Sequence, residues 1–336
     1  MRDFSHGHCT NLRIWAWALL CVLPLWLAGC GGGGGGSGVA AAPPPTPTPT
    51  TLSTTLAASV SSLALSVNDP GLNPALTGNP RIITVTNTGS VTATDVTVSV
   101  APALPSGTTV ASNCTNLAAA ASCTLTVTPG ATPSAAAGVL APAVPVATIA
   151  ASNGNTLAVP IQVLGYGSVY QGGYVFAIDD TTPDTGSVGG KVAALSDAST
   201  ALVWGGLGTA TGASSLSDGQ TNTATIVTVL GTGTYAAYAC TLPDHGYTDW
   251  YLPAICEMDT RGSGCPASTQ TMQSSLVDNG NVGALSGNNY WSSSEDLANT
   301  TFEAWGEFFS TGGTDVAYTA TKGFALDVRC ARQLTP

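Results

Sequence analysis

"ITVTNTGSVTATDVTVSV", residues 83–100, carries the clearest structural signal in the chain. Val or Ile recurs at every second position at both ends of the stretch, and Asn, Gly and Ser interrupt the pattern between them. A period of two places alternate side chains on one face of a strand, and a polar break between two such runs is typical of a turn. The stretch therefore predicts two short antiparallel strands.

Similar alternation extends outward from this stretch over residues 52–164. "SCTLTVTPG" (122–130) and "TLAVPIQVLG" (156–165) repeat it, and no helical period interrupts it. Evenly spaced short strands predict a β-sandwich. Together with "SNCTNLAAAASCTLTVTPGA" (112–131), the pattern resembles the immunoglobulin-like modules of bacterial surface proteins, and Cys114 and Cys123 are expected to form a local disulfide.

The composition of this segment favours a stalk over a binding module. It contains no Trp and no His, and its charged residues are Asp69, Arg81 and Asp95. Recognition surfaces are usually rich in exposed aromatic and charged side chains. The sandwich is therefore predicted to present whatever follows it.

The N-terminal segment predicts export. Residues 1–29 combine Arg2 and Arg13 with the apolar run "IWAWALLCVLPLWLAG" (14–29), which is too short to span a membrane and ends in small residues. "LAGC" (27–30) resembles the lipobox of bacterial lipoproteins, which implies cleavage before Cys30 and lipidation of that cysteine. The alternative is an ordinary secretory signal with a chance cysteine. Gly rather than Asp at position 31 implies, by the same resemblance, the outer membrane of a Gram-negative cell, on its periplasmic face or at the cell surface.

Residues 30–51 predict a tether, because a glycine run is flexible and the following Pro/Thr run is stiffer. After removal of residues 1–29 the chain keeps six Lys or Arg and eighteen Asp or Glu, a net charge of about −12. Such a charge argues against nucleic acid as a partner. The lipid is then the expected contact with the membrane, and no cofactor is expected.

Residues 166–336 predict a second domain of mixed structure. Strands are expected at "GGYVFAI", "KVAAL", "ALVWG", "EAWGEFFS", "VAYTA" and "FALDVRCAR", and helices within "DGQTNTATIVTVLG", "TYAAYAC", "AICEM" and "TQTMQSSLVD". Helices early and strands late predict an α+β fold. Four of the six cysteines left after processing lie here, and an even number in an exported chain indicates disulfides. The residues alone leave three possible pairings for these four.

Seven motifs in this segment occur in the order found in a known family: "YQGGYVFAIDD", "DGQTNTATIV", "YAAYAC", "TDWYLPAICEM", "NYWSSSE", "AWGEFFSTGG" and "VRCAR". Residues 168–332 thereby resemble the C-terminal domain of the Legionella collagen-like protein and its bacterial relatives. The resemblance implies a C-type-lectin-like fold, similar also to formylglycine-generating enzymes, and an adhesive role. It further implies a trimer and a disulfide between Cys240 and Cys330, which leaves Cys256 to pair with Cys265.

The ligand of the best-known relative, a sulfated glycosaminoglycan, does not carry over. Residues 166–336 hold five Lys or Arg against sixteen Asp or Glu, a net charge of −11. A sulfated polyanion would be repelled. The expected partner is therefore an unidentified glycan or protein.

"DHGYTDWYLPAICEMD" (244–259) holds the reactive side chains most suggestive of a site. Zinc needs several His or Cys ligands, and His245 is the one histidine in residues 166–336. Catalysis by a His base lacks an identifiable nucleophile, and Pro243 and Gly246 predict a turn around that histidine. The preferred interpretation is scaffold, with Trp250 and Leu252 in the core and Asp249 paired with backbone or an arginine; no catalytic residue or metal site is predicted.

Two further clusters have competing interpretations. Trp291 beside Glu295 in "NYWSSSE" fits a sugar-stacking surface, although a core tryptophan is preferred. Asp179, Asp180 and Asp184 in one loop fit a calcium site, although the loop lacks the regular spacing of an EF-hand and a solvated turn is preferred. Trp291 and Glu295 are retained as possible ligand-binding residues.

These features predict a lipid-anchored adhesin or ligand-binding protein of the cell envelope. A structural or assembly component of the envelope is the alternative, and an enzyme centred on His245, Glu257 or Glu295 has the least support.

Overall fold

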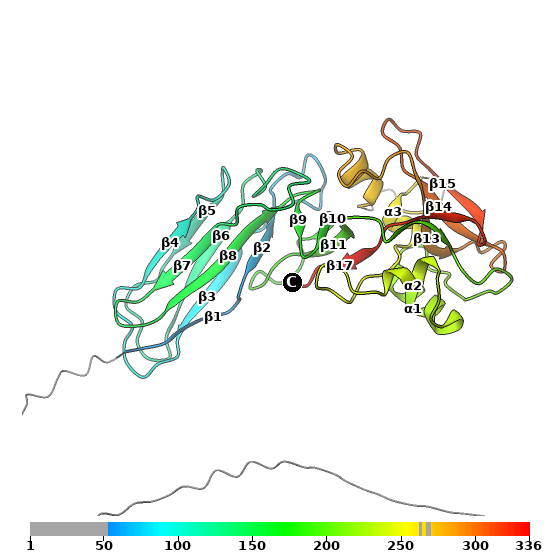
Figure 1. The fold of residues 1–336 in the computed structure, drawn as a ribbon. Coiled ribbons are helices and arrows are strands. Elements are labelled where there is room, and N and C mark those ends of the chain that lie inside the picture. Colours follow the sequence, from blue (N-terminus) through cyan, green and yellow to red (C-terminus); the bar gives the residue numbers. More distant parts are fainter. Residues whose placement is uncertain (1–52, 262–263, 267–269) are drawn as a thin grey trace, which may run out of the picture. The chain divides into compact units, whose positions relative to one another are not determined.

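The computed structural model describes residues 53–261, 264–266 and 270–336 (Figure 1). The chain divides into two compact units, residues 1–49 and 50–336, and all described residues belong to the second. The predicted signal segment, Cys30 and the tether at 30–51 lie outside the described residues. Among the described residues, no helix combines the length and the apolar character needed to cross a membrane.

Two four-stranded sheets form the first half of the described chain, in the orders β1-β3-β6-β5 and β2-β8-β7-β4. All their pairings are antiparallel except that of β2 with β8. Their strands are β1 (Leu56–Ala58), β2 (Leu63–Ser66), β3 (Arg81–Asn87), β4 (Thr97–Ala101), β5 (Thr109–Ser112), β6 (Ser122–Thr128), β7 (Val146–Ala150) and β8 (Thr156–Leu164).

The alternation of side chains explains how these sheets pack. In β3, Ile83 and Val85 are buried while Thr84 and Thr86 are half-buried, and β6 repeats the pattern with Leu125 and Val127. The buried faces of both sheets contribute to one apolar core, to which β7 adds Ile149. The first half is therefore a β-sandwich.

Two more sheets form the second half, in the orders β17-β11-β10-β9 and β12-β16-β13-β14-β15 (Figure 1). Their strands are β9 (Val169–Tyr170), β10 (Gly173–Asp179), β11 (Gly189–Ala194), β12 (Ser199–Val203), β13 (Asn289–Glu295), β14 (Glu303–Phe308), β15 (Val316–Thr321), β16 (Ala325–Val328) and β17 (Ala331–Gln333). Between β12 and β13 lie the helices α1 (Gly219–Leu230), α2 (Ala236–Cys240) and α3 (Ile255–Met258) and a π-helical turn, η1 (Gln273–Val277).

The predicted α+β, C-type-lectin-like fold of residues 166–336 is wrong. Four sheets account for 35% of the residues and helices for only 10%, which fits an all-β fold better. Helices were predicted where they occur, but α2, α3 and η1 have five, four and five residues. "NYWSSSE", for which no strand was predicted, forms β13, a central strand of the five-stranded sheet.

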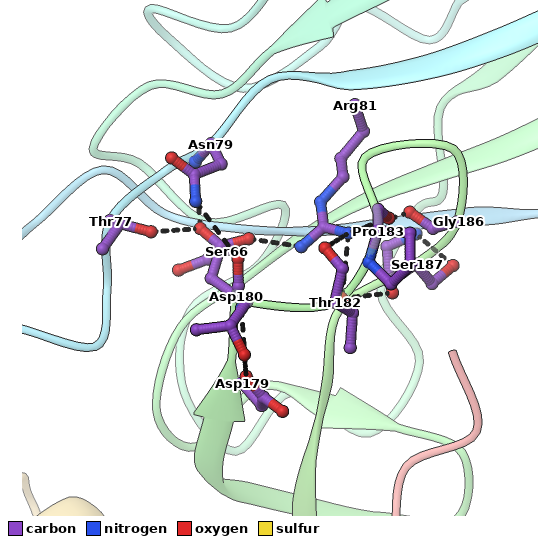
Figure 2. Close-up of polar contacts among 12 residues, drawn as sticks. Ser66, Thr77, Asn79, Arg81, Asp179, Asp180, Thr182, Pro183, Gly186 and Ser187 are labelled. Carbon is purple, nitrogen blue, oxygen red and sulfur yellow. Dashed lines mark hydrogen bonds and ion pairs between the residues drawn. The ribbon is translucent and has the colours of Figure 1, made fainter.

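A buried polar junction joins the sandwich to the loop after β10 (Figure 2). Arg81 at the start of β3 pairs through Nη2 with Asp180 Oδ1 at 2.5 Å, and both side chains are almost fully buried. Through Nη1 the arginine also donates to carbonyl oxygens of that loop, at 3.2 Å to Thr182 and 2.7 Å to Pro183. The loop is thereby fixed to the sandwich.

Apolar side chains continue the junction. Val67 and Val163 of the sandwich belong to the same buried cluster as Val188 and Val192 of the second half. Beside it, the amide of Val188 donates to the carbonyl of Ala64 at 3.0 Å. The sandwich and the second half consequently share part of one core.

Candidate functional site

The segment 244–259 serves the scaffold. Trp250 and Leu252 are buried in the main core of the second half. Asp249 pairs with Arg332 of β17 at 2.5 Å, which selects the arginine from the two partners expected for it. The guanidinium of Arg332 also stacks over the ring of Tyr247, 3.8 Å from its centroid. These contacts anchor the segment to the last strand.

His245 lies on an exposed turn. Its φ of +48° places it in the left-handed region, and the backbone of Asp244 and Tyr247 closes the turn with two hydrogen bonds. Its imidazole Nδ1 lies 2.7 Å from the carboxylate of Asp244, and both side chains are more than 40% exposed. Among the described residues, no serine or cysteine side chain forms a hydrogen bond with this histidine.

Trp291 and Glu295 lie in the core. Both are fully buried, and the Trp291 indole donates to the Leu202 carbonyl at 2.9 Å. A sugar stacks on a ring whose face is open to solvent, and this ring has no such face. Neither residue therefore offers a surface to a ligand.

Glu295 is instead one half of a buried ion pair. Lys322 Nζ lies 2.5 Å from Glu295 Oε1 and 4.3 Å from the centre of the Trp204 ring. Burial acts to raise the pKa of Glu295, but hydrogen bonds from Lys322 and from the amide and hydroxyl of Thr211 outweigh it and hold the pKa below its ordinary value. Burial in turn lowers the pKa of Lys322. The pair fixes the loop after β12 to the end of β15.

The acidic loop after β10 is likewise structural. Asp180 is the partner of Arg81, and its second carboxylate oxygen accepts hydrogen bonds from the Thr77 hydroxyl and the Asn79 amide. Asp179 accepts from the amide and hydroxyl of Thr181 in its own turn. Two of the three carboxylates suggested for calcium, those of Asp179 and Asp180, thus have protein donors as partners, and Asp184 is exposed.

Glu257 also has a full set of partners. Its carboxylate pairs with Lys191 at 2.6 Å and accepts hydrogen bonds from the Tyr251 hydroxyl and from the amides of Gly219 and Ala254. Burial, followed by the charge of Glu257, raises the pKa of Tyr251 well above its ordinary value. Through these contacts Glu257 connects α1 and α3 to β11.

The three predicted disulfides are present. Cys114 pairs with Cys123, Cys240 with Cys330, and Cys256 with Cys265. Cys240–Cys330 joins α2 to the last strands, and Cys256–Cys265 lies beside Trp305 of β14. The pairing implied by the family resemblance is therefore the one observed.

Adjoining loops carry the exposed apolar side chains of Leu207, Phe302 and Phe324, which are 56, 50 and 60% exposed, and Leu297, 62% exposed, lies on the same loop as Phe302. The loops are joined, since Gly208 donates through its amide to the Thr301 carbonyl and Lys322 to the Phe302 carbonyl. A Cβ at Gly323 would lie 3.3 Å from the Leu207 side chain. We call Leu207, Phe302 and Phe324 the apolar patch. Lys322, next to the patch, is buried.

A second candidate is a buried cluster of three carboxylates: Asp259 after α3, Glu307 in β14 and Asp315 just before β15. One oxygen of each lies within 4.8 Å of the other two. Burial, then the charges of Asp259 and Asp315, raises the pKa of Glu307 to about 9, while Arg261 acts in the opposite direction. Such a cluster is suited to a hard metal cation.

The sequence interpretation missed both the apolar patch and the carboxylate cluster. Glu307 offered a signal, since it lies two residues after Trp305 and two before Phe309, at alternate positions where a strand places side chains on one face. The patch residues lie on loops, where an apolar side chain is ordinary until its neighbours are known.

Comparison with known proteins identifies no relative: no family model matches the chain, and no curated protein matches it.

Proposed function

We propose that this chain is a lipid-anchored protein of the bacterial cell envelope that binds a ligand through the apolar patch Leu207, Phe302 and Phe324. The leader and "LAGC" motif support the anchor at Cys30, and the outer membrane is the proposed location. The sandwich supplies a stalk for the second half, to which the Arg81–Asp180 pair fixes it.

The exposure of Phe302 and Phe324 is the observation that carries the binding role. Exposed aromatic side chains grouped with another apolar residue mark interaction surfaces more often than isolated apolar residues do. The surrounding segment 296–301 supplies Asp, Asn and Thr side chains, which can hydrogen-bond to sugar hydroxyls. An aromatic face beside such groups suits a glycan of low charge, because the net charge of −11 over residues 166–336 disfavours anionic ones.

Binding of residues 50–336, which form one compact unit, to a broad array of neutral and amino glycans tests this proposal. We expect saturable binding that the double substitution Phe302→Ser, Phe324→Ser weakens at least about tenfold, the loss of roughly 1.4 kcal/mol of binding free energy. Leu140→Ser is the matched control, since Leu140 is 63% exposed but belongs to the sandwich segment. Equal binding by wild type and double variant would refute the role of the patch.

Self-assembly of the envelope protein is the second candidate, because an exposed apolar patch can also pair with a second copy. Sedimentation of the same proteins distinguishes the two functions. A concentration-dependent oligomer that Phe302→Ser and Phe324→Ser abolish, together with no binding on the glycan array, would favour assembly over ligand recognition.

A further inference from the structure

The carboxylate cluster carries more negative charge than its described neighbours compensate. Asp259, Glu307 and Asp315 contribute three formal charges, and Arg261 is the cation that contacts them, through Asp315 Oδ1. If all three are ionised, a charge of −2 is left in a buried site. Buried carboxylates without a partner are strongly disfavoured, so the cluster either keeps a proton, as the raised pKa of Glu307 indicates, or binds a cation.

The unpartnered oxygens point to where that partner belongs. Neither carboxylate oxygen of Glu307, a residue with no exposed surface, makes a hydrogen bond of ordinary geometry with the described residues, and Asp315 Oδ2 likewise makes none. Buried polar atoms in folded proteins are nearly always satisfied by protein, water or an ion. These three oxygens belong to carboxylates that converge within 4.8 Å, so a single ligand between them would satisfy them together.

We propose that Asp259, Glu307 and Asp315 form a binding site for one divalent cation, with calcium the preferred ion. All the ligand atoms are carboxylate oxygens, which select hard cations over zinc or copper. Calcium–oxygen bonds of about 2.3–2.6 Å allow oxygens on one ion to lie as far as about 5 Å apart, so a spacing within 4.8 Å is compatible with a shared ion. Magnesium usually keeps several waters and is held by one or two carboxylates, whereas three carboxylates converge here.

Arg261 is placed to respond to the ion. Its amide donates to Asp259 Oδ2 at 3.0 Å while its guanidinium pairs with Asp315, and its side chain is 50% exposed. A divalent ion of the same sign as the guanidinium would repel it into the solvent that already surrounds half of it. Asp315 Oδ1 would then be free to join Oδ2 on the ion.

The site would link two segments distant in the sequence. Asp259 follows α3, which the Cys256–Cys265 disulfide holds, while Glu307 and Asp315 lie on the β14–β15 hairpin. An ion bound to all three would stabilise the folded chain, because it binds the assembled cluster and not the separated segments.

Calcium titration of residues 50–336, stripped with chelator and desalted, tests the site by isothermal calorimetry. We expect one ion per chain with a Kd on the order of 10⁻⁴ to 10⁻³ M, as in extracellular modules, and a rise in the thermal midpoint in millimolar CaCl₂. Terbium provides a local readout, since the indole of Trp305 packs beside Cys256 and Ala317 near the cluster and can sensitise its emission.

Glu307→Gln separates ion binding from folding. The glutamine keeps the shape of a side chain that accepts no hydrogen bond of ordinary geometry from the described residues, so the variant should fold and its midpoint without calcium should equal or exceed that of wild type. We expect its calcium affinity to fall at least about tenfold and terbium emission to fall with it. Glu303→Gln, on the same strand but outside the cluster, should bind like wild type.

Two results would overturn the site. The first is wild-type protein that gives neither a calcium heat nor terbium emission. The second is Glu307→Gln protein that binds calcium with wild-type affinity, which would assign the ion to other carboxylates.

Discussion

Arg81 and Asp180 form an almost fully buried ion pair between the β-sandwich and the loop that follows β10, with Nη2 and Oδ1 2.5 Å apart. The pair is reinforced on both sides, because the arginine also donates to loop carbonyls and the aspartate also accepts from Thr77 and Asn79. The pair is one of the contacts that join the two halves of the compact unit 50–336.

Replacing Arg81 with Met should destabilise residues 50–336 by about 3–5 kcal/mol, because Asp180 would remain buried without its cation. Asp180→Asn should also destabilise, and the double variant Arg81→Met, Asp180→Asn should recover part of the loss, since no unpaired charge is left. Urea denaturation of the four proteins measures the coupling. Strictly additive losses would show that the pair contributes no interaction of its own.

Because of the Lys322–Glu295 pair, the free energy of unfolding should fall at acidic pH. The folded-state pKa of Glu295 lies below its ordinary value of 4.5, so its contribution to stability is complete above that value and is lost as the pH falls through the folded-state pKa. Protonation would leave Lys322 buried without a counter-charge. We expect stability to decline below about pH 4.5.

The double variant Lys322→Met, Glu295→Gln tests this assignment. It removes both titrating groups, so its free energy of unfolding should fall less at acidic pH than that of wild type. Lys322→Met alone should lower the free energy of unfolding by about 3–5 kcal/mol at neutral pH, since it leaves the Glu295 carboxylate buried without its cation. Urea denaturation from pH 3 to 7 compares the proteins. If the double variant loses as much stability at acidic pH as wild type, the effect belongs to other carboxylates.

How much of this structure was predictable depends on whether the signal was local. The alternation around Ile83 and Val85 is local, and this kind of pattern placed β3, β4, β6 and β8 without any knowledge of partners, whereas β1, β2, β5 and β7 were not singled out. The same pattern did not predict β13, because three consecutive serines are typical of a loop. In the structure Ser292, Ser293 and Ser294 are fully buried. Ser292 and Ser294 find hydrogen-bond partners in Trp305 and Ser215, which are 13 and 79 residues away.

The candidate sites depend even more on contacts that the sequence does not display. Asp259 and Glu307 are 48 residues apart, and only the packing of α3 against β14 brings them together. Trp291 and Glu295, chosen for their residue types, lie in the core because a tryptophan on a central strand contributes more to packing than to recognition.

Loss of the Cys240–Cys330 disulfide should cost more stability than loss of Cys114–Cys123. The sequence separations are 90 and 9 residues, and the chain-entropy model assigns about 4–5 kcal/mol to the longer loop and about 2–3 to the shorter. Thermal and urea unfolding of the two Cys→Ala double variants should therefore differ by about 2 kcal/mol. Equal losses would mean that strain or residual structure in the unfolded chain outweighs loop entropy.

Gly219 at the start of α1 should not tolerate alanine, although alanine ordinarily favours a helix by about 0.5–1 kcal/mol over glycine. A Cβ there would lie 2.5 Å from Glu257 Oε2 and 2.6 Å from both the Leu252 carbonyl and the Ala254 amide. Backbone atoms cannot yield as a flexible side chain would, so α1 or the Glu257 contacts must shift.

We expect Gly219→Ala to lower the free energy of unfolding by about 1–3 kcal/mol, the usual cost of overpacking. Gln220→Ala is the matched control, because Gln220 is exposed at the next position of the same helix and its replacement should be neutral or slightly stabilising. Urea denaturation compares the two. A Gly219→Ala protein as stable as the control would show that helix propensity outweighs the close approach of α1 to the segment 252–257, and that the Glu257 contacts can adjust without cost.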